Sequence, residues 1–190
     1  MKRLLPIAAA LLLGACTAIP VKTLYKLATS DPMTLDPSAL RVAAQLPDWA
    51  APRPEGVKLV LGMEREGEPG INERFSLQPV PAALEGKSLN DAAKAGYQLY
   101  AYRLAPADIP RLQHFRDTLK TKKADGGKKP KSTLSIGVDA CRKTVLPAGA
   151  IPLTTYLLLD RESGYMPLVV DFDLRKEVEG KDLATLIPPC

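Results

Sequence analysis

Histidine, cysteine and aromatic residues are scarce in this chain of 190 residues, which has one histidine, three cysteines, one tryptophan, six tyrosines and three phenylalanines. A structural zinc site needs about four histidine or cysteine ligands at short spacings, and the sequence has no Cys-x-x-Cys pair. The patterns G-x-S-x-G, H-E-x-x-H and G-x-G-x-x-G and the phosphate loop are absent as well. We therefore predict no metal and no cofactor. Enzymatic activity stays uncertain, since it would need a site assembled from scattered residues.

The sequence also lacks a hydrophobic run of the roughly 20 residues that cross a bilayer. Its N-terminal apolar run, Leu4 to Leu13, follows Lys2 and Arg3 and has the length of a signal-peptide core. The next residues complete a four-residue box: Leu13, Gly14, Ala15 and Cys16. The basic start, the length of the apolar run and the four residues that end in Cys16 together resemble the lipobox signal peptide of bacterial lipoproteins.

The resemblance implies cleavage between Ala15 and Cys16, diacylglycerol on the Cys16 sulfur and acylation of the new amine. Two or three acyl chains give a durable membrane anchor. Thr17 follows, where aspartate is the familiar signal for inner-membrane retention, so an outer-membrane site facing the periplasm is favoured. The alternative is an ordinary secretory signal in which a cysteine falls by chance. We divide the chain into a signal peptide (1–15), a lipidated tether (16–38) and one globular domain (39–190).

With Cys16 lipidated, Cys141 and Cys190 remain, and two thiols in an oxidising compartment commonly pair. We predict a structural disulfide that fixes the C-terminus and stabilises the fold by about 3–4 kcal/mol in the chain-entropy model. A redox or metal site is the weaker alternative, because the spacing fits neither.

Basic charge concentrates in one segment, 120–131. It carries six lysines and one acidic residue, Asp125: Lys120, Lys122, Lys123, Lys128, Lys129 and Lys131. A nucleic-acid-binding face would carry dispersed basic residues with interleaved aromatics, so we expect no nucleic acid. The lysines are a candidate contact for anionic lipopolysaccharide, lipid headgroups or an acidic partner protein. The alternative, a mobile solvated loop, is favoured by charge self-repulsion and by Gly126 and Gly127.

Eighteen prolines argue against long helices and favour strands joined by loops. Alternating apolar residues predict strands over 40–46, 57–63, 75–77, 97–104, 134–140, 154–159 and 168–174. Residues 21–27 are a further candidate strand. A helix that begins at Pro37 is an alternative to the strand over 40–46. We predict a proline-rich connection over 49–55. The strand over 97–104, aromatic on both faces, should be central. We predict a mainly β (α+β) fold, a β-sandwich-like domain of about seven strands with one inserted amphipathic helix.

The predicted helix spans residues 108–123. Asp108 can cap it, and Pro110 lies in the first turn, where a missing N–H is harmless. Its apolar residues share one face: Ile109, Leu112, Phe115 and Leu119. A short helix is also expected after Ser88.

Three further sets of residues could have either a chemical or a structural role. His114 should lie on the solvated face of the helix, since no nucleophile or orienting partner is apparent. Asp171 and Asp173, two residues apart on a strand, could bind a metal, but a solvated strand face explains them as well. The aromatic residues could line a groove, with Trp49 the strongest candidate, or fill the core.

These features predict a membrane-anchored envelope lipoprotein that acts as a binding or accessory module for an unidentified ligand or partner. The alternatives are a structural subunit of an envelope assembly, or a hydrolase with an unrecognised site.

Overall fold

The computed structural model describes residues 19–29, 36–178 and 182–190. Seven strands and five α-helices make up most of these residues, and two short 3-10 turns, Ala82–Leu84 and Pro106–Asp108, complete the regular structure. The strands are β1 (Arg41–Pro47), β2 (Ala50–Glu64), β3 (Ile71–Val80), β4 (Tyr97–Leu104), β5 (Lys131–Arg142), β6 (Pro152–Leu158) and β7 (Met166–Asp173). The helices are α1 (Val21–Thr29), α2 (Lys87–Asn90), α3 (Ile109–Ala124), α4 (Leu174–Glu177) and α5 (Leu183–Leu186). The mainly β fold with seven strands is confirmed.

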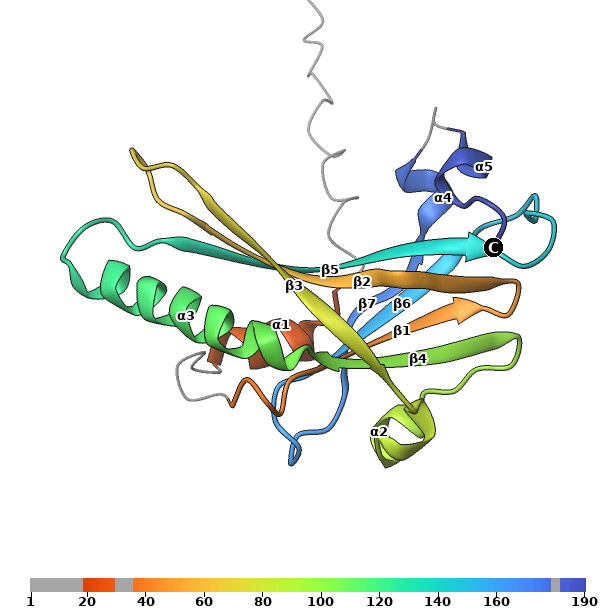
Figure 1. Ribbon diagram of the computed structural model, residues 1–190, viewed down its shortest axis with the longest axis horizontal. Helices are drawn as coiled ribbons and strands as arrows, with labels where there is room; N and C mark the ends of the chain where they lie inside the picture. Colours follow the sequence, from red (N-terminus) through yellow and green to blue (C-terminus); the bar gives the residue numbers. More distant parts are fainter. Residues whose placement is uncertain (1–18, 30–35, 179–181) are drawn as a thin grey trace, which may run out of the picture.

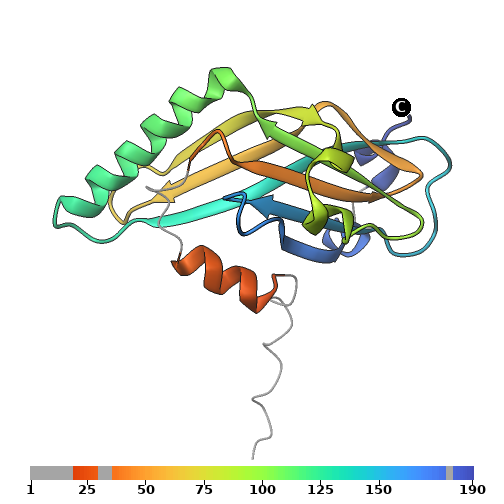
Figure 2. The same ribbon diagram turned by 90° about the horizontal axis from the view of Figure 1, so that it is seen from below.

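All seven strands belong to one antiparallel sheet in the order β5-β2-β3-β4-β1-β6-β7. The sheet is strongly curled, and α3 and α1 lie beside it (Figures 1 and 2). β4 is central in this order, as its aromatic pattern predicted, and β6 and β7 form the predicted hairpin. The strand order leaves β5 and β7 as the two ends of the curl.

The curl arises in β3, which changes partner along its length. Its first half, Ile71–Ser76, pairs with β2, and its second half, Leu77–Val80, pairs with β4. A strand that switches partners in this way turns a corner between two layers. One layer is therefore β5, β2 and the start of β3, and the other is the end of β3 with β4, β1, β6 and β7. The sandwich-like packing comes from one bent sheet.

The main core fills the space between these two layers. It joins apolar side chains of β2 and β3 to those of β4, β1 and β6 and to the inner face of α3. Its largest fully buried members include Phe75, Leu59, Leu157 and Val42. A second cluster on the other side of β1 and β4 contains Leu89 of the predicted short helix. Burial on both faces accounts for the near-continuous apolar sequence of β1.

A buried carboxylate holds the corner of β3. Asp108 Oδ2 accepts a hydrogen bond from the Ser76 amide at 2.6 Å, and its Oδ1 accepts one from Arg111 Nη1 at 2.7 Å. Arg111 also donates to Glu73 Oε2 at 2.7 Å and lies over the Phe75 ring. Asp108 occupies the predicted N-cap position of α3, but its side chain makes no capping hydrogen bond, because its oxygens accept from Ser76 and Arg111 instead.

The prediction of a proline-rich connection over 49–55 is wrong, because β2 begins at Ala50. Its pairing with β5 is interrupted between Pro52 and Val57 by a bulge. Over residues 50–57 β2 pairs with β5 alone, and the bulge leaves Pro54 outside the hydrogen-bond ladder, so the prolines of this segment are tolerated. Gly56 is required there, since a Cβ would lie 2.5 Å from the Asp139 carbonyl oxygen.

Residues 21–27 form a helix, so the prediction of a first strand there is wrong. The Thr23 and Leu24 amides donate to the Pro20 carbonyl and start the first turn. The Thr23 hydroxyl donates to the carbonyl of Pro167 in β7 at 2.6 Å. Leu24 and Leu27, three positions apart, then share one side of the helix.

Half of the segment 120–131 lies in regular structure, so it is not one continuous loop, and its expected mobility stays a prediction. α3 continues to Ala124, and β5 begins at Lys131. Arg65, in the β2–β3 turn, binds the residues that connect α3 to β5. Its Nη1 and Nη2 each donate to Asp125 at 2.6 Å, and its Nε donates to the Lys128 carbonyl at 2.8 Å. This ion pair lowers the pKa of Asp125 to about 2.

The corner carboxylate gives a stability prediction. Asp108→Ala should lower the free energy of unfolding by about 1.5–3 kcal/mol, because the hydrogen bonds that the charged carboxylate accepts from Ser76 and Arg111 are lost. Urea denaturation of the purified domain measures this change. Asp117→Ala, at an exposed position of the same helix, is the control and should change the free energy by less than about 0.5 kcal/mol. Equal effects of both substitutions would show that Asp108 does not hold the corner.

Candidate functional site

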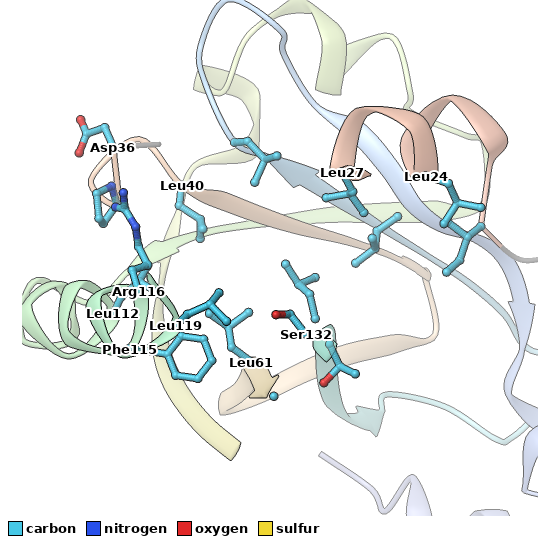
Figure 3. A pocket seen from close by; sticks show the side chains of 17 residues that line it. Leu24, Leu27, Asp36, Leu40, Leu61, Leu112, Phe115, Arg116, Leu119 and Ser132 are labelled. Carbon is cyan, nitrogen blue, oxygen red and sulfur yellow. The ribbon is translucent and has the colours of Figure 1, made fainter. Parts of the chain in front are cut away.

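An apolar cavity of about 490 Å³ lies between the sheet and the helices α1 and α3 (Figure 3). The cavity is open to solvent, because Asp36, Ser132 and Thr133 of its lining are exposed. Volumes of roughly 300–1,000 Å³ with mainly apolar walls are typical of small-molecule sites. The cavity is therefore the candidate functional site.

α3 supplies one wall of the cavity through the apolar face that its sequence predicted. Leu112, Phe115 and Leu119 are buried and point from α3 into the space. The same three side chains belong to the main core. The cavity therefore adjoins the main core along α3.

The opposite walls come from parts of the chain that are far apart in sequence. Leu61 of β2 lies on the sheet side, and Leu24 and Leu27 of α1 face it from the other side (Figure 3). Leu134 of β5 also lines the cavity. The remaining apolar lining residues are Ile19, Pro37, Leu40, Leu159 and Leu168. No pattern in the sequence indicates this assembly, since residues 21–27 are predicted to form a strand.

Four polar or charged side chains also line the cavity: Asp36, Arg116, Ser132 and Thr133. Asp36 Oδ1 and Oδ2 accept hydrogen bonds from the amide and hydroxyl of Ser38, which lowers the pKa of Asp36, and the charge of Arg116 lowers it further. Asp36 is exposed, so these charges lie toward solvent. The lining has no histidine, cysteine or second carboxylate with which Asp36 could share a proton or a metal. The arrangement fits the holding of an apolar molecule.

No protein family matches the chain. No curated protein and no solved structure matches it either.

The candidate lysines of 120–131 lie apart from the cavity lining. Lys122 pairs with Glu68 and Lys128 with Glu66, both from the β2–β3 turn. Lys120, Lys123, Lys129 and Lys131 are exposed. Two of the six charges are therefore compensated within the domain, and a role of this patch in binding anionic surfaces stays a prediction.

The other residues singled out in the sequence are dispersed. His114 is exposed on α3. Asp171 is exposed and lies 3.5 Å from Lys94 Nζ, whereas Asp173 Oδ1 accepts from the amides of Ile151 and Arg175 and caps α4. These backbone hydrogen bonds lower the pKa of Asp173. Among the described residues no group of three or more histidines, cysteines and carboxylates could hold a metal.

The aromatic residues do not form a groove. Tyr102, Tyr156 and Tyr165 are buried in the core clusters, and Tyr25 is exposed. Trp49 packs against a small cluster around Ile151 near the C-terminus. Within the described part of the chain, no helix is long and apolar enough to span a membrane. Cys16 and the box residues Leu13, Gly14 and Ala15 lie outside the described residues.

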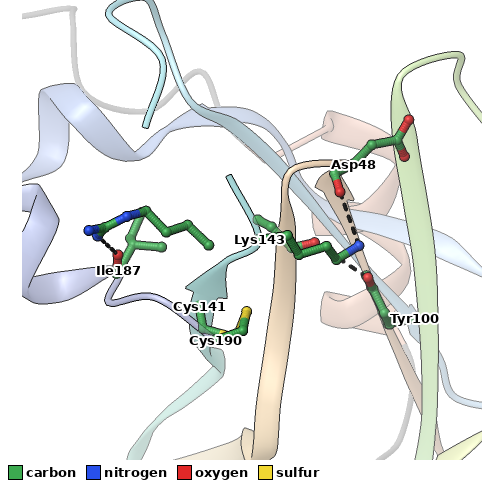
Figure 4. The surroundings of a disulfide bond; sticks show 8 residues. Asp48, Tyr100, Cys141, Lys143, Ile187 and Cys190 are labelled. Atoms are coloured by element: carbon green, nitrogen blue, oxygen red, sulfur yellow. Dashed lines mark hydrogen bonds between the residues drawn. A yellow bond between two sulfur atoms is a disulfide. The ribbon is translucent and has the colours of Figure 1, made fainter. Parts of the chain in front are cut away.

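The predicted pairing of Cys141 with Cys190 is present, with Cα atoms 5.0 Å apart (Figure 4). The C-terminal residues run beside the end of β5: the Arg142 amide donates to the Pro188 carbonyl, and the Cys190 amide donates to the Arg142 carbonyl. Arg142 Nη1 also donates to the Ile187 carbonyl at 2.6 Å. The disulfide therefore fixes the last residues at one end of the curled sheet, away from the cavity lining.

Removing this bond tests its contribution. Cys190 is exposed, so Cys190→Ser leaves the core intact, and we expect a loss of about 3–4 kcal/mol in the free energy of unfolding. Amide exchange in 182–190 should accelerate as well. Denaturation and hydrogen exchange of the oxidised protein and the variant measure both effects. The reduced wild-type protein is the control and should match the variant, and an unchanged variant would contradict a stabilising bond.

Proposed function

We propose that the mature chain is a lipid-anchored envelope protein that binds a small apolar molecule in the cavity between α1, α3 and the sheet. The observation that carries this proposal is the cavity itself, about 490 Å³ with mostly leucine walls. An apolar cavity of about 150 Å³ binds benzene, so this volume offers room for roughly 20 carbon atoms. Burial of such a molecule is favourable by about 25 cal/mol per Å² of apolar surface.

The composition of the lining supports binding over catalysis. General acid–base or nucleophilic chemistry needs a reacting group and a partner within hydrogen-bond reach. Asp36, the acidic residue of the lining, accepts its hydrogen bonds from Ser38, and its lowered pKa keeps it ionised at neutral pH. The charges of Asp36 and Arg116 can instead orient a polar end of the ligand.

The proposed location rests on the lipobox resemblance at Leu13 to Cys16. Thr17 stands where aspartate would signal retention in the inner membrane, which favours an outer-membrane anchor. The disulfide fits the periplasm, since disulfides persist in oxidising compartments. In this setting the domain would capture an apolar molecule beside the membrane.

A substitution on α1 tests binding without disturbing the sheet. Leu24 lines the cavity, and Val21 on the same helix does not. In the soluble chain carrying Cys16→Ser, Leu24→Asn should weaken binding of the neutral fluorescent probe phenylnaphthylamine about five- to tenfold, because a polar amide replaces an apolar contact. Fluorescence titration gives the dissociation constants.

Val21→Asn is the matched control and should bind the probe as the parent does. Absence of probe binding by the parent, or equal binding by all three proteins, would contradict a ligand site in this cavity.

The anchor is tested separately. Cys16→Ser should abolish incorporation of labelled acyl chains and release the protein from the membrane fraction, because the modified sulfur is lost. Metabolic labelling and fractionation after carbonate and salt washes provide the readout. Cys190→Ser, which removes a different thiol, should remain labelled and membrane-bound. A Cys16→Ser protein that stays in the washed membranes would show that lipid on Cys16 is not the anchor.

A further inference from the structure

Large apolar side chains are exposed mainly in one short region of the protein. Four of the eight exposed large hydrophobic residues described lie within the seven residues 19–25: Ile19, Val21, Leu24 and Tyr25. Val21 is 80% exposed and Tyr25 is 71% exposed. The other four are scattered along the rest of the chain. A cluster of this kind marks a contact surface, whereas single exposed residues do not.

α1 has two faces with different surroundings. Thr23 is buried and bound to β7, and Leu27 packs against the core. Val21 and Tyr25, four residues apart, occupy one side of the helix and point away from the domain. Leu24 lies at the border, partly exposed and also lining the cavity. The inner face already attaches the helix to the domain, so the apolar side chains of the outer face are not needed for that attachment.

The chain length before α1 decides what can reach this outer face. Val21 follows Cys16 by five residues. A fully extended chain covers at most about 3.6 Å per residue, so the Val21 backbone lies within roughly 18 Å of a lipidated Cys16. The lipid of Cys16 would be embedded in the bilayer, so α1 must lie close to the membrane surface. The nearest extended apolar phase is then the bilayer itself.

The charge of this segment suits an anionic membrane. Residues 17–29 contain Lys22 and Lys26 and no acidic residue. Lys22 is exposed, and Lys26 lies 3.6 Å from Asp160. A short helix with an apolar face and basic flanks lies in the headgroup region with its axis parallel to the surface. Basic residues next to the surface are attracted to anionic lipids.

We propose that the outer face of α1, formed by Val21 and Tyr25, inserts into the headgroup region of the membrane that carries the Cys16 anchor. This inference rests on the lipid anchor of the proposed function. It places the α1 side of the cavity, with Leu24 at its border, against the bilayer. An apolar ligand can then pass between the lipid phase and the cavity without crossing water.

The test measures the depth of α1 in lipidated protein reconstituted into vesicles of phosphatidylethanolamine with a minority of phosphatidylglycerol. In a Trp49→Phe background, Tyr25→Trp places a single tryptophan on the outer face of α1. Lipids brominated along their chains should quench this tryptophan at least about threefold more than a tryptophan placed by Val145→Trp. Val145 is the matched control, an equally exposed apolar residue in the β5–β6 connection.

A second measurement needs no substitution of Trp49. Hydrogen exchange in 19–29 should be slower in the vesicle-bound protein than in the soluble Cys16→Ser chain. Flotation of the vesicles establishes that the anchor is in place, so a failed anchor and a failed helix contact give different results. Quenching at position 25 together with slowed exchange supports the proposal. Two results would overturn the proposal when the protein floats with the vesicles. Equal quenching at positions 25 and 145 would show that solvent covers the outer face of α1. Slowed exchange without quenching would show that a protein covers it.

Discussion

The hydrogen bond between the Asp108 carboxylate and the Ser76 amide lies where β3 leaves β2 and joins β4, and the two-layer architecture depends on that change of partner. A strand that continued beside β2 would extend a flat sheet with both faces exposed. The turn at Ser76 brings β2 over β1 and creates the enclosed core. Because Arg111 binds Asp108 and Glu73 together, the start of α3 is fixed to the same corner. The position of α3 over the open side of the sheet follows from this attachment.

The cavity is a consequence of a sheet that curls without closing. In the strand order β5 and β7 are not neighbours, so no strand fills the space between these ends. α3 contributes three buried side chains to that space, and α1 contributes Leu24 and Leu27. Pairing of β5 with β7 would close this space. Because the cavity opens to solvent, an apolar molecule that enters it removes the apolar surface of the walls from water.

Local patterns were sufficient to predict much of the fold. The alternation of Leu134, Ile136 and Val138 identified β5, and the spacing of Leu112, Phe115 and Leu119 identified the inner face of α3. Features that depend on distant partners were missed. The prolines of 49–55 predicted a loop because the bulge that leaves Pro54 unpaired exists only opposite β5. The side chain of Asp108 was expected to cap the helix because its partner Ser76 lies 32 residues away. The cavity was missed for the same reason, since its walls come from segments far apart in the sequence that meet only after the sheet has curled.

α1 and the sheet corner are each held by a buried polar side chain. At the corner Asp108 accepts hydrogen bonds from the Ser76 amide and from Arg111. α1 is attached to β7 through the Thr23 hydroxyl and to Asp160 through the partly exposed Lys26, and such an exposed ion pair is worth only about 0–1 kcal/mol. Leu27 of α1 packs against the main core as well, so a ligand that enters beside α1 has to separate apolar contacts there. Local opening of this kind is how folded proteins admit ligands.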